Sequence, residues 1–384
     1  MSPLRTPAHS DKPFVYDMVS DTATIPSDEM FDIMKAASRG DDVYQTDDDS
    51  KILEDHVARL LGHEAALFCV SGTMSNQLGL RCLLFQPPHS VLCDSRSHVF
   101  NYECGGIAYH SQANVVPVVA KGTYMTAEEV EGRINRDGLC GAITKVISLE
   151  NTLNGTIMPI EEIRKIHDLA RANGIKMHID GARLWNASQE TGVPLSEYGK
   201  YFDTVSVCLS KGVGAPIGSM LVGSKELITR ARHIRKMMGG GWRQAGMLAA
   251  LARHCIDTIV PTMPATHKLA RDLANHLVSL GMRLVLPCET NLIFIDTHHT
   301  GISVVELAEA LKEKNILIFS GPGTSTRIAL HYQITPEAVE DFKQVATQLA
   351  QAKIKSGYVP PTANTTLETI EQTAEAVAYP TATN

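Results

Sequence analysis

A lysine that directly follows an apolar segment is the first residue that could take part in a chemical reaction. Lys211 comes after the run DTVSVCLS, with Ser210 before it and Gly212 and Gly214 after it. A lysine at the end of a predicted strand and among glycines is not typical of a solvated surface charge. Burial lowers the pKa of a lysine amine and makes the amine nucleophilic, as Schiff-base chemistry requires. The segment therefore favours a catalytic lysine over a structural one.

Three further segments carry polar residues just after predicted strands. Asp180 ends the run IKMHID with Arg183 three residues later, His98 follows the run SVLC, and the turn SGTMSNQ begins at Ser71 after the run AALFCV. Small residues at a helix start expose backbone N–H groups to an anion, although such a turn also occurs as an ordinary helix cap. Asp180 and Arg183 can equally form a structural ion pair, and a lone histidine is more often structural. Only the common position of these segments can decide between the two interpretations.

Six short apolar runs are predicted to be strands that alternate with helices. The runs are nearly continuous, which is typical of parallel strands covered on both faces. Between two of them, Pro159 to Gly174 has helical spacing of its apolar residues. This alternation predicts an α/β doubly wound sheet, in which ligands bind at the carboxyl ends of the strands. The predicted strands are residues 65–70, 90–93, 114–120, 143–150, 175–180 and 203–210.

The pattern changes after about residue 255. A helix-rich stretch at residues 268–280 is followed by shorter predicted strands and helices, up to a helix from Pro336 to about Lys355. This succession predicts a smaller C-terminal α+β domain. We therefore expect four parts, which are an N-terminal extension at 1–18, a large α/β domain at 19–255, a small α+β domain at 256–356 and a mobile tail at 357–384.

Composition excludes several classes of protein. The 384 residues include 35 basic and 42 acidic ones, so the formal net charge is −7, which argues against a nucleic-acid binder or a basic membrane-surface protein. No apolar run approaches the ~18 residues of a membrane-spanning helix, and the N-terminus has no apolar secretory core. The 8 cysteines form no CxxC pair, which favours buried free thiols in a reducing compartment. We expect a cytoplasmic protein without a metal site.

Together the four segments fit a site for pyridoxal 5′-phosphate. Lys211 would form an imine with the aldehyde of the cofactor, and Asp180 would keep its pyridine nitrogen protonated so that the ring can accept electrons. The helix start after Ser71 would hold the phosphate, the His98 ring would stack on the cofactor, and an arginine would bind a substrate carboxylate. The order of these segments also resembles that of fold-type I pyridoxal phosphate enzymes, as does the separation of 31 residues between Asp180 and Lys211.

A larger set of segments resembles the low-specificity L-threonine aldolase family, in its fungal-like branch. The likeness extends from about residue 18 to about residue 350, and it is carried by VSDTATIPSDEM, GDDVYQTDD, FCVSGTMSNQ, HVFNYECGG, SLENTLNG, HIDGARLWNA, CLSKGVGAPIGS and MMGGGWRQAG. The resemblance implies the fold-type I architecture, with a large, mostly parallel doubly wound sheet and a smaller C-terminal α+β domain. It also implies a homotetramer, or a homodimer, with shared active sites.

The resemblance further implies a role for each residue of the site. Lys211, Asp180 and His98 would be catalytic. The residues that would hold the cofactor are Gly72, Thr73, His98, Asp180, Arg183, Ser210, Lys211, Lys236 and Arg243, the last two at the phosphate of a neighbouring subunit. The residues that would bind the substrate are Ser20, Arg183 and Arg327 at its α-carboxylate, Asn154, and Tyr44 from across a dimer interface.

Three places depart from the family pattern. Gln45 stands where a glycine is usual, and since glutamine resists a positive φ we expect a different loop behind Tyr44. Ile25 stands where arginine is frequent. Leu153 and Asn154 occupy two positions at one of which the family commonly has a histidine, and asparagine cannot relay a proton near neutral pH. The departure puts efficient deprotonation of a substrate hydroxyl in question.

We predict a pyridoxal-phosphate-dependent carbon–carbon lyase that acts on a small amino acid. It would cleave L-threonine and L-allo-threonine to glycine and acetaldehyde by retro-aldol cleavage, through a Lys211 Schiff base and a glycine quinonoid. The alternative is an alanine or related amino-acid racemase on the same scaffold, as in fungal peptide biosynthesis. In that case Lys211 would serve one face of Cα, and a water, His98 or Tyr44 the other. Other β-hydroxy amino-acid aldolases and a silent relative are further alternatives, but a silent relative predicts loss of Lys211 or Asp180, and both are present.

Overall fold

The computed structural model describes residues 15–359, which form two compact units. The large unit contains residues 29–153 and 157–261, and the small unit contains residues 15–28, 154–156 and 262–359. The predicted boundaries at 19 and 255 stay predictions, and the two units divide the chain differently, because the segment before residue 29 pairs with C-terminal strands. Residues 1–14 of the predicted extension and 360–384 of the predicted tail lie outside the described residues.

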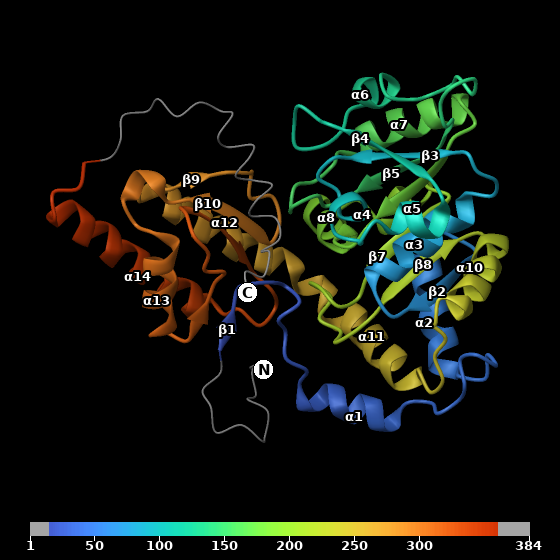
Figure 1. Cartoon of the computed structure of the whole chain (residues 1–384). Coiled ribbons are helices and arrows are strands. Elements are labelled where there is room, and N and C mark those ends of the chain that lie inside the picture. The colour runs from blue at the N-terminus through green and yellow to red at the C-terminus, as the bar shows by residue number, and fades with distance from the viewer. Residues whose placement is uncertain (1–14, 360–384) are drawn as a thin grey trace. The chain divides into compact units, whose positions relative to one another are not determined.

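A sheet of seven described strands forms the centre of the large unit (Figure 1). These strands are β2 (Ala65–Cys69), β3 (Ser90–Asp94), β4 (Asn114–Val118), β5 (Thr144–Glu150), β6 (Lys176–Asp180), β7 (Thr204–Cys208) and β8 (Ser219–Gly223). Their order across the sheet is β2-β8-β7-β6-β5-β3-β4, and only the pairs made by β8 are antiparallel. Every residue of β3, β7 and β8 is buried, so both faces are covered. The predicted mostly parallel α/β fold is confirmed.

The strand β8 was not expected from the sequence. Its run SMLVG is short and follows a glycine-rich loop, in which Gly214 and Gly218 have positive φ values of 84° and 112°. These glycines let the chain reverse after β7, so β8 returns antiparallel between β2 and β7. The other six strands are the six predicted runs, each within a few residues.

The helices of the large unit begin with clear local signals. The helices are α1 (Asp28–Ala36), α2 (Asp48–Leu60), α3 (Gly72–Leu83), α4 (His98–Asn101), α5 (Gly106–Ser111), α6 (Ala127–Glu131), α7 (Ile160–Ala172), α8 (Leu184–Thr191), α9 (Leu195–Gly199), α10 (Lys225–Met237), α11 (Gly246–Thr258) and the 3-10 helix η1 (Val260–Thr262). The N-cap Ser71 of α3 accepts a hydrogen bond from the Met74 backbone at 3.2 Å. Helix α7 follows Pro159 and ends before Gly174, as predicted.

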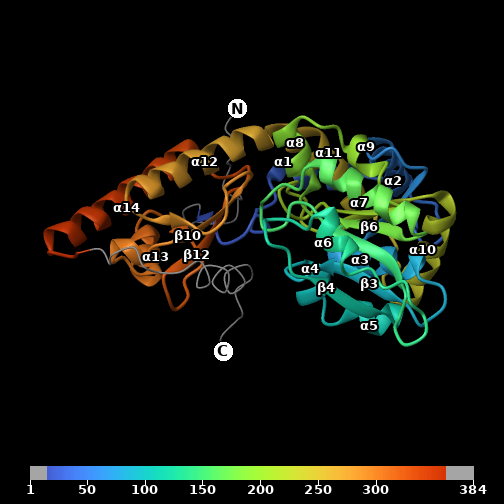
Figure 2. The ribbon, with the colours of Figure 1, turned by 90° about the horizontal axis from the view of Figure 1, so that it is seen from above.

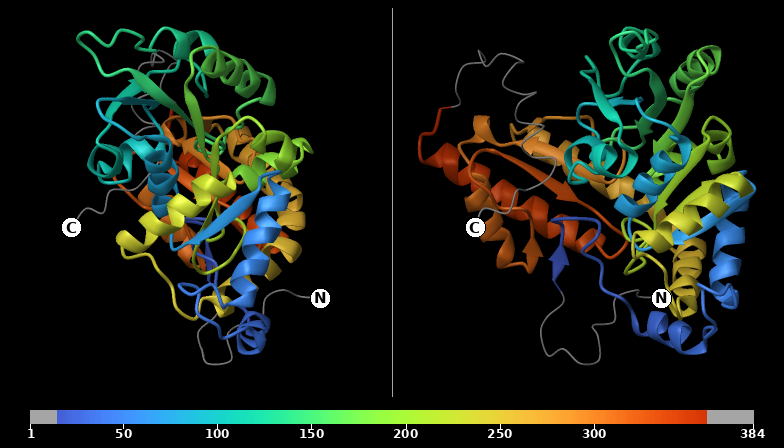
Figure 3. Two further views of the ribbon diagram at one scale, coloured as in Figure 1. Left: turned by 90° about the vertical axis from the view of Figure 1, so that its right-hand side faces the viewer. Right: turned by 45° about the vertical axis from the view of Figure 1, so that its right-hand side comes forward.

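The small unit joins an antiparallel sheet to three helices. Its elements are β1 (Tyr16–Asp17), α12 (Met263–Ser279), β9 (Arg283–Leu284), β10 (Leu292–Asp296), the 3-10 helix η2 (His298–Thr300), α13 (Val304–Lys312), β11 (Ile316–Leu317), β12 (Ser325–Ala329) and α14 (Pro336–Lys355). The strand order is β12-β10-β9, and β1 pairs in parallel with β11. Figure 2 shows α12 and α14 side by side, and Figure 3 shows red α14 against the orange strands. Ile293, Ile328, Leu277 and Phe342 form the core between these elements.

Most of the thiols are buried, but not all. Cys69, Cys82, Cys93, Cys208 and Cys255 are buried, and burial raises the pKa of the Cys69 thiol to about 12. The expectation of buried thiols is wrong for Cys104 and Cys140, which are exposed, and Cys288 is half-buried. Between residues 15 and 359, no helix has the length and apolar character needed to cross a bilayer.

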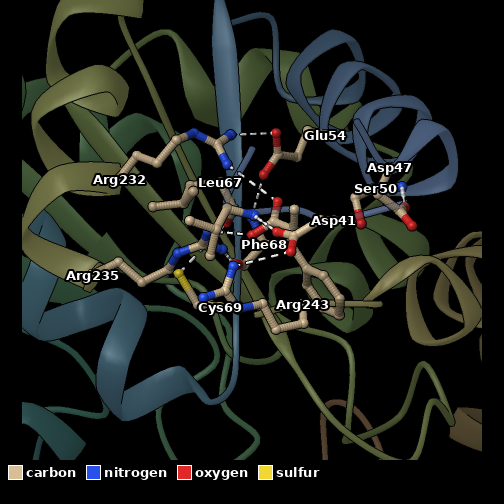
Figure 4. Close-up of polar contacts among 12 residues, drawn as sticks. Asp41, Asp47, Ser50, Glu54, Leu67, Phe68, Cys69, Arg232, Arg235 and Arg243 are labelled. Carbon is tan, nitrogen blue, oxygen red and sulfur yellow. Dashed lines mark hydrogen bonds and ion pairs between the residues drawn. The ribbon is translucent and has the colours of Figure 1, made fainter. Parts of the chain in front are cut away.

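A buried ion-pair cluster joins α2, α10 and β2 (Figure 4). The guanidinium of Arg235, which is 2% exposed, pairs with Asp42 and donates to the Phe68 carbonyl at 2.5 Å. Arg232 pairs with Asp42 at 3.3 Å and with Glu54 at 2.5 Å. Two guanidinium groups and two carboxylates therefore balance one another away from water, which makes the loss of one partner costly.

Replacing Arg235 by alanine should lower the free energy of unfolding by about 3–5 kcal/mol, because Asp42 would keep a buried charge with one partner fewer. Arg243→Ala is the matched control. Arg243 pairs with Asp41 at 3.0 Å, but its side chain is 54% exposed, so its loss should lower the free energy of unfolding far less than the loss of Arg235. Urea unfolding followed by circular dichroism measures both variants. An equal fall in the free energy of unfolding of both variants would contradict the expectation that the burial of an ion pair determines the cost of breaking it.

Candidate active site

The carboxyl ends of five strands bring the predicted catalytic residues to one edge of the large sheet. Strand β2 leads into α3 at Gly72, β3 leads to His98, β6 ends in Asp180, and β7 leads to the loop that carries Lys211. The strand β5 adds Glu150, which is in register with Asp180 on the neighbouring strand. Parallel strands gather these side chains at the edge where ligands bind in open α/β sheets.

The carboxylate of Asp180 is held rigidly at the end of β6. It is 2% exposed, and it accepts hydrogen bonds from the Ala182 backbone at 3.0 Å and from Asn76 Nδ2 at 2.8 Å. The next residue, Gly181, donates its N–H to the Ser206 carbonyl at 2.7 Å, and a Cβ there would lie 2.7 Å from that same oxygen. Only glycine permits this close approach, so the backbone directly after Asp180 is held in one conformation.

The ring of His98 lies beside acidic groups. Its Nδ1 is 2.9 Å from Glu103 Oε1, and its backbone N–H donates to Glu150 Oε2 at 2.7 Å. Burial lowers the pKa of His98, but the hydrogen bond to Glu103 and the charges of Asp180 and Glu150 outweigh burial and leave the pKa raised. Side-chain atoms of His98, Glu103 and Asp180 lie within 4.8 Å of one another.

The acceptors of this cluster suit a cationic partner. Glu103 accepts three side-chain hydrogen bonds and Asp180 accepts two hydrogen bonds. Burial, followed by the charge of Asp180, raises the pKa of Glu150 to about 8. The buried Asp180 carboxylate would stabilise a protonated pyridine nitrogen beside it.

The start of α3 offers donors to a phosphate. Its first turn contains no acidic residue, so the positive end of the helix is not neutralised by a nearby carboxylate. A Cβ on Gly72 would lie 2.7 Å from Cys208 Sγ, so the backbone packs directly against the end of β7. Thr73 is exposed and Ser210 is half-buried, and both carry hydroxyl groups. The donor set fits a phosphate, and the assignment of Gly72, Thr73 and Ser210 to that phosphate stays a prediction.

Lys211 sits in a tight loop after β7. Its carbonyl accepts the Gly214 N–H at 2.8 Å, and the Ala215 N–H donates to the Leu209 carbonyl at 3.0 Å. Lys211 is half-buried, and its positive charge acts on the Glu150 carboxyl. The loop therefore fixes the backbone of Lys211 at the same edge as Asp180.

The predicted arginine Arg183 is 7% exposed at the N-cap of α8. Helix α8 is tied to β7 by a hydrogen bond from Trp185 Nε1 to the Cys208 carbonyl at 3.0 Å. Arg183 follows Asp180 by three residues, so the turn after β6 supplies both a buried carboxylate and a buried guanidinium.

The loop of Tyr44 contains a residue in a conformation that glycine favours. Gln45 has a φ of +55°. The expected difference of this loop from the family pattern stays a prediction. Tyr44 is 74% exposed, and the guanidinium of Arg243 lies 5.7 Å from its ring centroid and 3.0 Å from Asp41. Lys236, at the end of α10, is exposed. The predicted phosphate contacts of Lys236 and Arg243 stay predictions.

Three predicted substrate residues belong to the small unit. Arg327 is 6% exposed and donates from Nη2 to the Val19 carbonyl at 2.9 Å, directly before Ser20. The Ser20 hydroxyl accepts a hydrogen bond from Thr22 Oγ1 at 2.9 Å. Asn154 has a φ of +51°. The structure thus brings Ser20 and Arg327 together within this unit, and the roles of all three stay predictions.

Sequence reasoning missed a group of buried polar residues. Asn76, Gln77, Glu103, Glu150 and His178 are all buried or half-buried around Asp180 and His98. Each lies inside a motif that was recognised. A polar side chain in an otherwise apolar strand or helix face was the available signal, and His178, two residues before Asp180, shows it most clearly.

A separate cavity of about 780 Å³ lies at the opposite, amino-terminal edge of the sheet. Its lining includes His63, Phe85, Phe202 and Asp203, and none of the predicted site residues. Asp203 is already paired with Lys176 at 3.0 Å. We therefore place the chemistry at the carboxyl edge, where the titratable groups converge, and not in this cavity.

The fold is that of the fold-type I pyridoxal phosphate enzymes. A solved structure of the Leishmania major threonine aldolase matches it with a TM-score of 0.74 at 20% identity, over 87% of this chain and 99% of that chain. Residues 17–300 match the Beta-eliminating lyase family, and the chain belongs to this family.

Two curated relatives differ in their names. A low-specificity L-threonine aldolase of Candida albicans is 47% identical over 330 residues, which is 85% of this chain and 87% of the relative. The alanine racemase TOXG of Cochliobolus carbonum is 35% identical over 346 residues, which is 88% of each chain.

Gln45→Gly should raise the free energy of unfolding by about 1 kcal/mol. Glycine removes the strain of a left-handed backbone, about 1–2 kcal/mol, and loses part of that gain to the flexibility of the unfolded chain. Denaturant unfolding measures the change. Gln45→Ala keeps a Cβ at the same φ and should stay within about 0.5 kcal/mol of wild type. Stabilisation by alanine as large as that by glycine would argue against strain at this position.

Glu150→Gln should remove one pH-dependent contribution to stability. Between about pH 4.5 and 8 the unfolded chain releases the Glu150 proton while the folded chain keeps it, so the contribution of Glu150 to stability falls as pH rises through this window. The variant should therefore gain stability relative to wild type from pH 5 to pH 8. The glutamine oxygen can still accept the His98 N–H, but the side chain does not titrate. Urea midpoints at pH 5, 6, 7 and 8 without added cofactor give the slopes, and parallel slopes would refute the assignment.

Proposed function

We propose that this chain is a pyridoxal-phosphate-dependent lyase that cleaves L-threonine and L-allo-threonine to glycine and acetaldehyde. The observation that carries the proposal is the 47% identity, over 85% of the chain, with a low-specificity L-threonine aldolase. The carboxyl edge of the large sheet supports it, because it combines a lysine, a buried carboxylate, an imidazole and a helix N-terminus.

Different residues of the large unit would contact different parts of the cofactor. When bound, pyridoxal phosphate supplies an aldehyde that condenses with amines and a ring that takes up the electron pair of a broken Cα bond. Lys211 would provide the amine that holds the cofactor. Asp180 would keep the pyridine nitrogen protonated, and His98 would stack on the ring. Gly72, Thr73 and Ser210 would bind the phosphate, with the predicted contribution of Lys236 and Arg243 from a neighbouring subunit.

The grip on the substrate decides which Cα bond breaks. By the family resemblance, Arg183, Ser20 and Arg327 would bind the α-carboxylate, and a fixed carboxylate would decide which Cα bond is weakened. Tyr44 and Asn154 contact the rest of the substrate. This assignment of roles follows the family resemblance.

Cleavage requires a group that accepts the proton of the substrate β-hydroxyl. Leu153 is buried and apolar, and Asn154 carries an amide, so neither can accept that proton. We assign this step to His98 or to a water that His98 holds. The raised pKa of His98 means that a smaller fraction of the ring is neutral and able to accept a proton at a given pH than for an ordinary histidine.

An amino-acid racemase is the second candidate function. The observation that favours it is the 35% identity with alanine racemase TOXG, together with the apolar Leu153. Racemisation needs a group that accepts the Cα proton on one face and a group that donates a proton on the other, and Lys211 would serve one face and a water, His98 or Tyr44 the other. The higher identity with the aldolase places this function second.

The location and the assembly of the enzyme extend the proposal. The free thiols described in the fold support a reducing, cytoplasmic environment. We propose a homotetramer, or a homodimer, with shared active sites, which the exposed Tyr44 and Arg243 support.

Chiral amino-acid analysis of one reaction separates the two functions. Purified protein with pyridoxal phosphate receives L-allo-threonine and L-alanine together, beside a Lys211→Ala control. We expect rapid formation of glycine with little D-alanine, and loss of at least about 1,000-fold in the control because the amine that holds the cofactor is gone. D-Alanine with little glycine would replace the aldolase by the racemase. Activity that persists in the control would overturn both.

A further inference from the structure

One side-chain amide connects the groups proposed to contact the cofactor. Asn76, on α3, is 1% exposed. Its Nδ2 donates to Glu103 Oε1 at 2.8 Å and to Asp180 Oδ2 at 2.8 Å. Glu103 in turn lies 2.9 Å from His98 Nδ1 and accepts Gln77 Nε2 at 2.5 Å. A single nitrogen therefore serves both buried carboxylates of the cluster.

The amide can serve both carboxylates in only one orientation. With Nδ2 toward Glu103 and Asp180, the Asn76 Oδ1 points at His178 Nε2, 3.1 Å away. The opposite orientation would turn an oxygen toward two acceptors, and each carboxylate would lose a donor. His178 Nε2 must therefore carry a hydrogen and donate it to Asn76.

The surroundings of His178 are compatible with that tautomer, because the Thr204 hydroxyl can donate as well as accept. The ring is fully buried, and its Nδ1 is 2.9 Å from Thr204 Oγ1. Burial lowers the pKa of His178 to about 4, so the ring is neutral and carries one hydrogen. With that hydrogen on Nε2, Nδ1 accepts from the Thr204 hydroxyl. The chain of hydrogen bonds from Thr204 through His178 to Asn76 thus has one consistent direction.

We propose that Asn76, oriented by His178, is the positioning residue that sets the Asp180 carboxylate and, through Glu103, the His98 ring for the cofactor. This inference rests on the proposed function, because it gives Asp180 and His98 their roles. Asn76 and His178 do not touch the cofactor in this assignment. They act by holding the groups that do, as outer partners hold the ligands of metal sites.

Asn76→Asp tests the donor without a change of size. Aspartate offers only acceptors, so Asp180 and Glu103 would lose a hydrogen bond and face a third carboxyl group. We expect the Kd for pyridoxal phosphate to rise about 10- to 100-fold, the range that loss of an outer partner causes in metal sites. The pH dependence of the visible absorption band of the bound cofactor should shift as well, since the charge beside its ring changes.

A pair of variants at His178 tests the direction of the chain. His178→Gln keeps an N–H donor for Asn76 Oδ1, whereas His178→Leu keeps the bulk and has no donor. We expect the Kd of His178→Leu for pyridoxal phosphate to rise as in Asn76→Asp, and the Kd of His178→Gln to stay closer to that of wild type. Leu78→Ala is the matched control, because Leu78 is fully buried on the same helix but faces an apolar cluster with Leu67 and Leu221. It should lower stability and leave the Kd within about twofold.

The measurement is a titration of each purified protein with pyridoxal phosphate, followed by absorbance and by intrinsic fluorescence, from pH 6 to 9. Circular dichroism confirms that each variant is folded, and if Asn76→Asp does not fold, the His178 pair decides. The inference would be overturned if Asn76→Asp had the Kd and the absorption band of wild type, or if the two His178 variants had the same Kd. Either result would leave the proposed function standing. Failure of the wild-type protein to bind the cofactor would overturn the proposed function and the inference with it.

Discussion

Two carboxyl groups buried side by side are the constraint on which the site depends. Glu103 and Asp180 need hydrogen-bond partners away from water, and the chain supplies Asn76, Gln77 and His98. These partners come from different elements, so the sheet, α3 and the turn after β3 must all be in place together. The hydrogen bonds of these buried carboxyl groups therefore form only when the fold is complete.

The parallel part of the fold could be predicted because its signals are local. Continuous apolar runs marked six strands, and the rule that ligands bind at carboxyl ends brought His98, Asp180 and Lys211 to one edge. The family resemblance then named the cofactor and the reaction class. Both expectations agree with the comparisons, since the chain belongs to the Beta-eliminating lyase family.

What the sequence did not predict depends on distant partners. The strand β8 is stabilised by pairing with β2 and β7, and its own run of five residues carries little signal. Asn76 meets Asp180 across 104 positions of the chain, and no spacing rule connects them. Gln45 adopts a positive φ because the loop requires it, against the preference of glutamine. In each case tertiary structure overrides a local preference.

The distribution of exposed and buried thiols leaves Cys104 near the site as a residue to which a dye can be attached. Cys104 follows Glu103 directly and is exposed, whereas burial raises the pKa of Cys69 and Cys93 to about 12 and keeps them protonated and unreactive. A maleimide dye therefore reaches Cys104 and Cys140, which is also exposed, before the buried thiols. With Cys140 replaced by serine, one fluorophore would stand next to the buried carboxylates, and it would report motion of that turn in the native enzyme without any engineered cysteine.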